Sequence, residues 1–154
     1  LVRKVKVRGY VSCVTDCPYD GRVAPDAVAA VAGELMAMGC YEVSLGDTIG
    51  QGTPETIRDM LIAVLDRVPA GRLAGHYHDT GGRALDNIEM SLELGLRVFD
   101  AAVGGLGGCP YAPGAKGNVA TEKVHDRLTA LGLSTGLDRE VLGRAGDMAK
   151  AMRG

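Results

Sequence analysis

Residues 41–65, YEVSLGDTIGQGTPETIRDMLIAVL, contain in order a short apolar segment, a glycine-rich turn and an amphipathic segment. Glu42–Leu45 is typical of a short buried strand. Thr53 followed by Pro54 predicts the start of a helix, because threonine caps helices and proline is tolerated in their first turn. The next apolar residues have the spacing of one helical face: Ile57, Met60, Leu61, Val64 and Leu65. The stretch therefore predicts one strand-turn-helix unit.

The same order of elements recurs along the whole chain. Further strands are expected at residues 5–13, 73–78 and 98–103, and further helices at residues 27–38, 83–94, 121–131 and 138–152, with a loop over residues 16–24. Gly39 and Gly95 are placed to end two of these helices. Strands that alternate with amphipathic helices are typical of α/β proteins with a parallel sheet.

Composition narrows the possible functions. The chain has 154 residues, of which 46% are hydrophobic and 23% charged, so it can form a packed core. The 19 acidic residues outnumber the 17 basic ones, which argues against nucleic acid as the main partner. No apolar run approaches the roughly 18 residues of a membrane span. Because the chain starts at Leu1 without a signal peptide and is rich in alanine, glycine and arginine, we expect a longer natural protein in a bacterial cytoplasm.

Two histidines at the end of the third predicted strand form the first candidate site. Side chains alternate along a strand, so His76 and His78 point to the same face and could bind one metal ion. Active sites of parallel βα-barrels lie at this end of the strands. Two hydrogen-bonded histidines without a metal are the alternative, and the spacing alone leaves both interpretations open.

The glycine-rich loop at residues 104–118 follows the fourth predicted strand and contains Cys109. Such a loop can close over a ligand, and its thiol could act as acid, base or nucleophile. The alternative is a surface loop with an incidental cysteine.

Asp47, at the end of the second predicted strand, is expected at the same edge as the histidines. It could be a general acid/base, a substrate acceptor or a support for a metal ligand, although aspartates in such loops are more often helix caps.

Five motifs, in uninterrupted order, resemble the hydroxymethylglutaryl-CoA lyase family. They are RGYVSC (8–13), CPYDG (17–21), GCYEVSLGDTIGQGTP (39–54), HYHDT (76–80) and GGLGGCPYAPGAKGNVATE (104–122). Related Claisen-type synthases share the His-x-His motif but have a Gly-Glu-Arg-x-Gly-Asn type of loop. Here Ala115-Lys116-Gly117 precedes Asn118, and the loop contains a cysteine, which favours the lyases.

The resemblance implies an α/β fold of the (β/α)8 TIM barrel type. A barrel of this kind takes about 250 residues. Residues 1–154 would therefore form one partial domain, with about the last four βα units and the C-terminal helices. The implied reaction is the cleavage of 3-hydroxy-3-methylglutaryl-CoA to acetyl-CoA and acetoacetate with a divalent metal.

The same resemblance implies roles for individual residues. His76, His78 and Asn118 would bind the divalent cation, and Mg²⁺ or Mn²⁺ suits this set of imidazole and oxygen donors. The Cys109 thiol would move protons as acetyl-CoA is released.

Three further residues would surround the substrate and the metal. Ser44 and Asp47 would face the hydroxymethylglutaryl portion of the substrate, with Asp47 as a second catalytic residue. Glu122 would support the site from behind Asn118.

One feature of the family has no counterpart in this sequence. The first barrel strand of the family carries an Asp-Arg pair whose aspartate is a metal ligand, so residues 1–154 alone are expected to be inactive. The longer protein is expected to bind an acyl-CoA substrate and to form a homodimer or higher homo-oligomer. Two alternatives remain: a related metal-dependent synthase or aldolase-like lyase acting on another acyl-CoA or 2-oxo acid, and a non-catalytic half-barrel that serves as a binding or assembly module.

Overall fold

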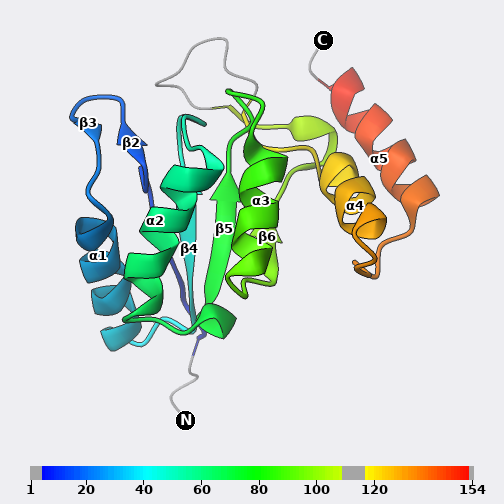
Figure 1. The fold of residues 1–154 in the computed structure, drawn as a ribbon. Coiled ribbons are helices and arrows are strands. Elements are labelled where there is room, and N and C mark those ends of the chain that lie inside the picture. Colours follow the sequence, from blue (N-terminus) through cyan, green and yellow to red (C-terminus); the bar gives the residue numbers. More distant parts are fainter. Residues whose placement is uncertain (1–4, 109–116, 153–154) are drawn as a thin grey trace.

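A computed structural model describes residues 5–108 and 117–152 (Figure 1). Its main feature is a four-stranded sheet in the order β1-β4-β5-β6. The strands are β1 (Arg8–Val11), β4 (Glu42–Asp47), β5 (Leu73–Tyr77) and β6 (Val98–Asp100). All three strand pairs are parallel, and each chain crossover passes through a helix. The predicted α/β fold with a parallel sheet is confirmed.

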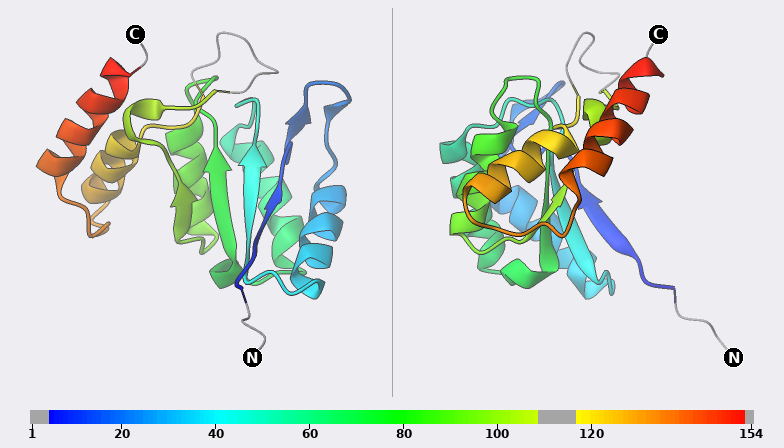
Figure 2. Two further views of the ribbon diagram at one scale, coloured as in Figure 1. Left: turned by 180° about the vertical axis from the view of Figure 1, so that it is seen from behind. Right: turned by 90° about the vertical axis from the view of Figure 1, so that its right-hand side faces the viewer.

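The crossover helices all cover the same face of the sheet. They are α1 (Pro25–Ala37), α2 (Pro54–Leu65) and α3 (Ala84–Glu93). Seen from behind, the strands lie in front of these helices, and no described helix covers that face (Figure 2). The sheet therefore has one face packed against helices and one uncovered face.

The start of α2 is the one expected. The Thr53 side chain accepts a hydrogen bond from Thr56 N, and the Thr56 side chain accepts one from Thr53 N in return, which forms a capping box. Gly39 and Gly95 follow α1 and α3 with φ angles of 98° and 95°, the left-handed conformation that ends helices. Local sequence signals thus mark the start of α2 and the ends of α1 and α3.

The hydrophobic core lies between the sheet and α1–α3. Branched aliphatic side chains dominate it, as expected for parallel strands buried beneath helices. Its largest fully buried members include Leu45, Ile57, Met60, Leu61, Leu73, Tyr77, Ile88 and Leu96. The Tyr77 hydroxyl is hydrogen-bonded to Ser91 Oγ of α3 at 2.8 Å, so its polar end is also satisfied.

Two parts of the first βα unit differ from expectation. The loop expected at residues 16–24 contains a small antiparallel hairpin, β2 (Asp16–Cys17) and β3 (Gly21–Arg22). The strand expected at residues 5–13 is shorter at both ends, and beyond its carboxyl end Cys13 has a φ of 58° and its backbone N–H donates to Thr48 Oγ1. This contact turns the chain out of the sheet and toward the neighbouring loop.

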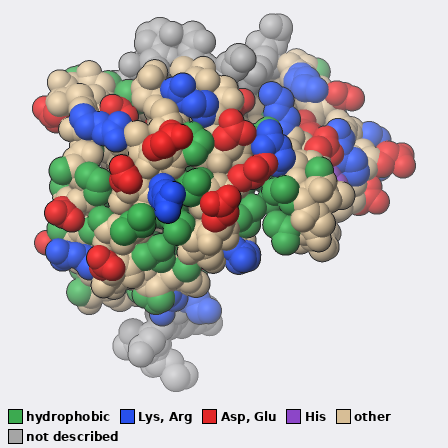
Figure 3. All heavy atoms as spheres, viewed as in Figure 1, with side chains coloured by type: hydrophobic (Ala, Val, Ile, Leu, Met, Phe, Trp, Pro, Cys, Tyr) green, Lys and Arg blue, Asp and Glu red, His purple; other side chains and the backbone are tan. Residues whose placement is uncertain are grey.

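Beyond β6 the chain forms the short turn η2 (Val103–Gly105) and the helices α4 (Thr121–Ala130) and α5 (Arg139–Ala151). Another short turn, η1 (Ala70–Arg72), precedes β5. Acidic and basic side chains are interspersed over the helix-covered side (Figure 3). None of the helices in the described ranges is long and apolar enough to span a membrane.

Gly75 of β5 tests the packing of the helix-covered face. A Cβ at Gly75 would lie 2.9 Å from the Tyr77 ring and 3.0 Å from Phe99 Cδ1. Gly75→Ala should therefore destabilise the protein by about 1–3 kcal/mol through overpacking. Gly71 provides the control, because a Cβ there would have no neighbour within 4 Å among the described residues. Gly71→Ala should change stability by no more than about 0.5 kcal/mol. Chemical denaturation measures both, and equal stability of the two variants would contradict the packing argument.

Candidate metal centre at the carboxyl ends of the strands

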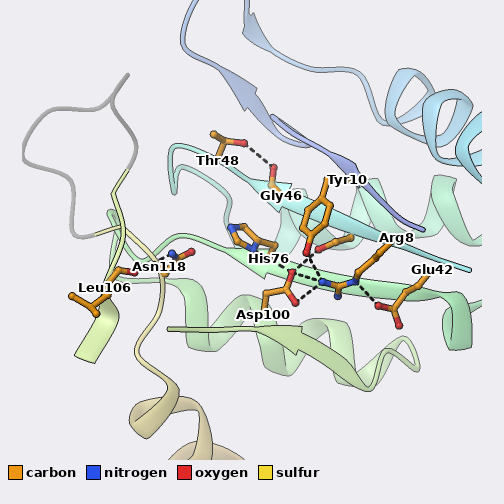
Figure 4. Close-up of polar contacts among 10 residues, drawn as sticks. Arg8, Tyr10, Glu42, Gly46, Thr48, His76, Asp100, Leu106 and Asn118 are labelled. Carbon is orange, nitrogen blue, oxygen red and sulfur yellow. Dashed lines mark hydrogen bonds and ion pairs between the residues drawn. The ribbon is translucent and has the colours of Figure 1, made fainter. Parts of the chain in front are cut away.

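His76 and His78 lie at the carboxyl end of β5, one within the strand and one just after it. Their ring centroids are 5.4 Å apart, with 47° between the ring planes. His76 is partly exposed on the uncovered face, whereas His78 is 7% exposed. The pair is thus close enough to contribute to one site; Figure 4 shows His76 with its polar neighbours.

The surroundings of His78 favour a neutral imidazole. Burial, and secondarily the neighbouring His76, lower the pKa of His78 below its ordinary value. Its Nδ1 is buried and has no hydrogen-bond partner among the described residues. A neutral ring with an unsatisfied nitrogen is what metal coordination requires of histidine.

Asn118 is brought to His78 by the backbone. The two residues form an isolated antiparallel bridge, and the adjacent Asp79 N donates to Gly117 O at 2.7 Å. Asn118 Nδ2 donates to Leu106 O at 3.0 Å, which orients the amide and leaves Oδ1 for another partner (Figure 4). Two imidazoles and an amide oxygen fit a divalent cation that accepts nitrogen and oxygen ligands. The described ranges contain no group of three or more His, Cys, Asp or Glu side chains suited to hold a metal. The candidate set therefore depends on the amide of Asn118.

Asp100 of β6 is the residue that the sequence reasoning missed. Its Oδ2 lies 3.3 Å from His76 Nδ1 and 2.8 Å from Ser44 Oγ. Arg8 Nη1 donates to both carboxylate oxygens, at 2.8 and 3.0 Å, while Arg8 Nε donates to Glu42 at 2.5 Å. Burial alone would raise the pKa of Asp100, but the hydrogen bonds from His76, Arg8 and Ser44 outweigh it and lower the pKa to about 2. Asp100 is therefore an ionised carboxylate held by side chains from the other three strands of the sheet.

A sequence signal for Asp100 does exist. Acidic side chains are rare within strands of parallel sheets, yet Asp100 ends the short strand VFD. In the parallel register Asp100 is directly opposite His76, so both point to the same face. Arg8 is the first residue of β1 and therefore lies toward the amino end of the sheet. Its long side chain nevertheless reaches Asp100.

Asp47 is almost completely buried at the end of β4. Its carboxylate accepts hydrogen bonds from Gln51 N (3.2 Å), Gly52 N (2.9 Å) and Thr15 Oγ1 (3.3 Å). Burial raises the pKa of Asp47 despite these bonds. Its described contacts organise the loop between β4 and α2, and contact with substrate stays a prediction for this residue.

Ser44 and Glu122 also have defined partners. Ser44 is fully buried and donates to Asp100, so its expected contact with substrate likewise stays a prediction. Both carboxylate oxygens of Glu122 lie 3.0 Å from Gly104 N, at the start of the glycine-rich loop. Cys109 lies outside the described residues.

A cavity of about 270 Å³ adjoins Asn118. Its lining combines both charge signs with glycine backbone: Asp79, Gly104, Gly105, Asn118, Ala120, Glu122, Lys123 and Lys150. The candidate metal ligand Asn118 thus borders a space large enough for part of a small ligand.

A parallel α/β sheet that gathers imidazole and amide groups at its carboxyl edge is typical of proteins that bind small ligands at this edge. The HMGL-like family model matches residues 1–148. The chain therefore belongs to the HMGL-like family.

Individual relatives agree with this assignment. The chain is 57% identical to the mitochondrial hydroxymethylglutaryl-CoA lyase of Rattus norvegicus over 143 residues. This alignment covers 93% of the present chain and 44% of the rat protein. The HMG-CoA lyase crystal structure from Brucella melitensis matches with a TM-score of 0.95 and 64% identity, over 97% of this chain and 53% of that one. An HMG-CoA lyase from Acinetobacter baumannii in complex with coenzyme A and 3-methylmalate matches with a TM-score of 0.84 and 34% identity, over 90% and 46% of the two chains. The chain spans about half the length of these relatives.

The contact between α5 and Glu122 gives a test of the loop anchor. A Cβ at Gly146 would lie 2.0 Å from Glu122 Oε1, whereas one at Gly143 on the same helix would meet only the end of the Arg139 side chain at 3.3 Å. Both Gly→Ala changes favour the helix by up to about 1 kcal/mol. We expect Gly143→Ala to raise the melting temperature and Gly146→Ala to lower it, since only the second displaces the carboxylate. Thermal unfolding followed by circular dichroism measures the difference, and a gain in both variants would contradict it.

Proposed function

We propose that the protein containing this chain is a 3-hydroxy-3-methylglutaryl-CoA lyase, which cleaves its substrate to acetyl-CoA and acetoacetate. The observation that carries the proposal is the approach of His76, His78 and Asn118 at one sheet edge, in a chain of the HMGL-like family. Identity of 57% to the rat lyase supports the same reaction.

His76, His78 and Asn118 would hold a divalent cation, with Mg²⁺ or Mn²⁺ favoured. The cation would supply Lewis acidity toward the substrate oxygens and a template for their orientation. His78 suits this role because burial keeps its ring neutral, and Asn118 because its amide is oriented through Leu106 O.

The reaction requires a proton to leave the C3 hydroxyl of the substrate and a proton to reach the departing acetyl carbon. We assign the second transfer to the Cys109 thiol and substrate contacts to Ser44 and Asp47. Glu122 supports the glycine-rich loop through Gly104 N, which places the base of that loop beside the cavity at Asn118. A closed loop would also exclude water from the reacting carbon.

We propose further that the sheet is half of an eight-stranded barrel. The uncovered face carries Arg8, Glu42, His76 and Asp100, which suits a polar barrel interior (Figure 4). Strands β1 and β6 form the two edges of the described sheet, where further strands could pair. The chain also spans 53% of the Brucella lyase. Residues 1–154 would then form one partial domain of a longer protein.

The partners follow from the same proposal. An acyl-CoA ligand is supported by the Acinetobacter relative, whose structure contains coenzyme A. A homodimer or higher homo-oligomer and a bacterial cytoplasmic location are further parts of the proposal, although the rat relative is described as mitochondrial.

Separate variants test the metal ligands and the thiol. In the full-length protein, His76→Ala should weaken Mn²⁺ binding by at least tenfold and lower turnover, because it removes a ligand. Cys109→Ala should lower turnover with little change in Mn²⁺ affinity. His125→Ala, remote on α4, serves as control. Titration calorimetry with Mn²⁺ and a coupled assay for acetoacetate are the measurements. Equal loss of metal in the Cys109 and His76 variants would contradict the assigned roles, and condensation in place of carbon–carbon bond cleavage would favour a synthase.

The barrel proposal makes a prediction for the isolated chain. Residues 1–154 alone should show no cleavage of 3-hydroxy-3-methylglutaryl-CoA with added Mn²⁺, because the family's first-strand Asp-Arg pair is missing and two sheet edges lack their partners. The full-length protein in the same assay is the control. Measurable turnover by the isolated chain would contradict the half-barrel proposal.

A further inference from the structure

All four strands of the sheet contribute side chains to a single polar cluster. Asp100 of β6 accepts from Arg8 of β1 and Ser44 of β4, and it lies 3.3 Å from Nδ1 of His76 of β5. Arg8, His76 and Asp100 lie together on the uncovered face (Figure 4). His78 and Asn118 form a backbone bridge just after β5. The cluster therefore links side chains from all four strands to His76, one of the candidate metal ligands.

The carboxylate of Asp100 is held rigidly. Arg8 Nη1 contacts both of its oxygens, and Glu42 holds the other side of the Arg8 guanidinium at 2.5 Å. The side chains of Arg8, Glu42 and Asp100 are 17%, 14% and 23% exposed, so solvent has limited access to these bonds. A fixed, charged acceptor thus faces one nitrogen of His76.

An imidazole has two ring nitrogens, and a neutral ring has one hydrogen. Because Asp100 can only accept when ionised, the hydrogen bond requires the His76 hydrogen on Nδ1. The lone pair is then on Nε2, at the opposite side of the ring. Histidines that bind metals commonly donate their other N–H to a carboxylate in this way.

We propose that Asp100 is the positioning residue of the site: through Nδ1 of His76 it fixes the ring orientation and leaves Nε2 as the metal-binding nitrogen. This inference rests on the proposed function, since it concerns the same candidate centre. Asp100 acts through His76 and is not itself a ligand.

The neighbouring His78 provides an internal comparison. Its Nδ1 is buried without a partner in the described part of the chain, and Asp100 contacts His76 rather than His78. Loss of Asp100 should therefore alter the tautomer of His76 and leave that of His78 unchanged. A general disturbance of the fold would affect both rings.

The test uses the full-length protein labelled with ¹⁵N-histidine, free of metal, and long-range ¹H–¹⁵N correlation spectra that identify each tautomer. His76→Ala and His78→Ala spectra assign the signals. Wild-type His76 should be in the Nδ1–H form. In Asp100→Asn the amide oxygen is expected to face Arg8 and its NH₂ group to face His76, so the ring should change to the Nε2–H form.

Mn²⁺ affinity is the second readout. Asp100→Asn should weaken binding about 10–100-fold. Glu42→Gln is the matched control, because it removes a carboxylate charge beside Arg8, keeps an amide oxygen that can accept from Arg8 Nε, and has no hydrogen bond to His76 to lose in the described part of the chain. It should retain wild-type affinity and the Nδ1–H tautomer.

The outcomes separate the two proposals. An Nε2–H tautomer of His76 in the wild type would overturn the role of Asp100 even if the variant fails to fold. So would an Asp100→Asn protein that binds Mn²⁺ as tightly as the wild type. A wild-type protein that neither binds Mn²⁺ nor cleaves the acyl-CoA would instead overturn the proposed function, while the tautomer spectra still decide whether Asp100 orients His76.

Discussion

The uncovered face of the sheet depends on the ion pair between Arg8 and Asp100. Adjacent strands lie about 4.8 Å apart, so the first and fourth strands of a flat sheet would be about 14 Å apart. Two side chains bridge this span most readily when the sheet curves toward the face that carries them, as it does in barrels. The pair also neutralises groups that would otherwise be costly to bury, since Arg8 and Asp100 are each less than one-quarter exposed. Ser44 and His76 complete the bonds of the carboxylate, so the pair also sets the position of the candidate metal ligand.

The loops at the carboxyl edge are held by a second kind of constraint, in which buried polar groups bind backbone. Asp47 accepts from Gly52 N, and Asn87 of α3 donates to Gly52 O, so one residue of the β4–α2 loop is held from two sides. A Cβ on Gly50 would lie 2.9 Å from His78 O, which shows how closely this loop approaches the histidine strand. The loops are therefore built with little room for adjustment beside the candidate centre.

Most of the fold could be predicted from local signals. Thr53-Pro54 marks the start of α2, Gly39 and Gly95 end their helices, and the alternation of strands and helices gives the parallel sheet. The hairpin in residues 16–24 could not, since each of its strands has only two residues. The histidine pair was identifiable from strand alternation, but Asp100 was not, because its importance arises from partners 24 to 92 residues away. Long-range pairing across four strands depends on register, which local patterns do not encode.

The cluster around Asp100 also affects how sequences of this kind can change. Its members share one carboxylate, so the energetic effect of replacing one depends on whether the others are present, and their effects are not additive. Loss of Asp100 alone leaves a partly buried arginine with Glu42 as its one carboxylate partner among the described residues, whereas joint loss of Arg8 and Asp100 removes both charges together. Positions 8 and 100 are therefore expected to covary in divergent sequences, as a coupled pair separated by about three-fifths of this chain.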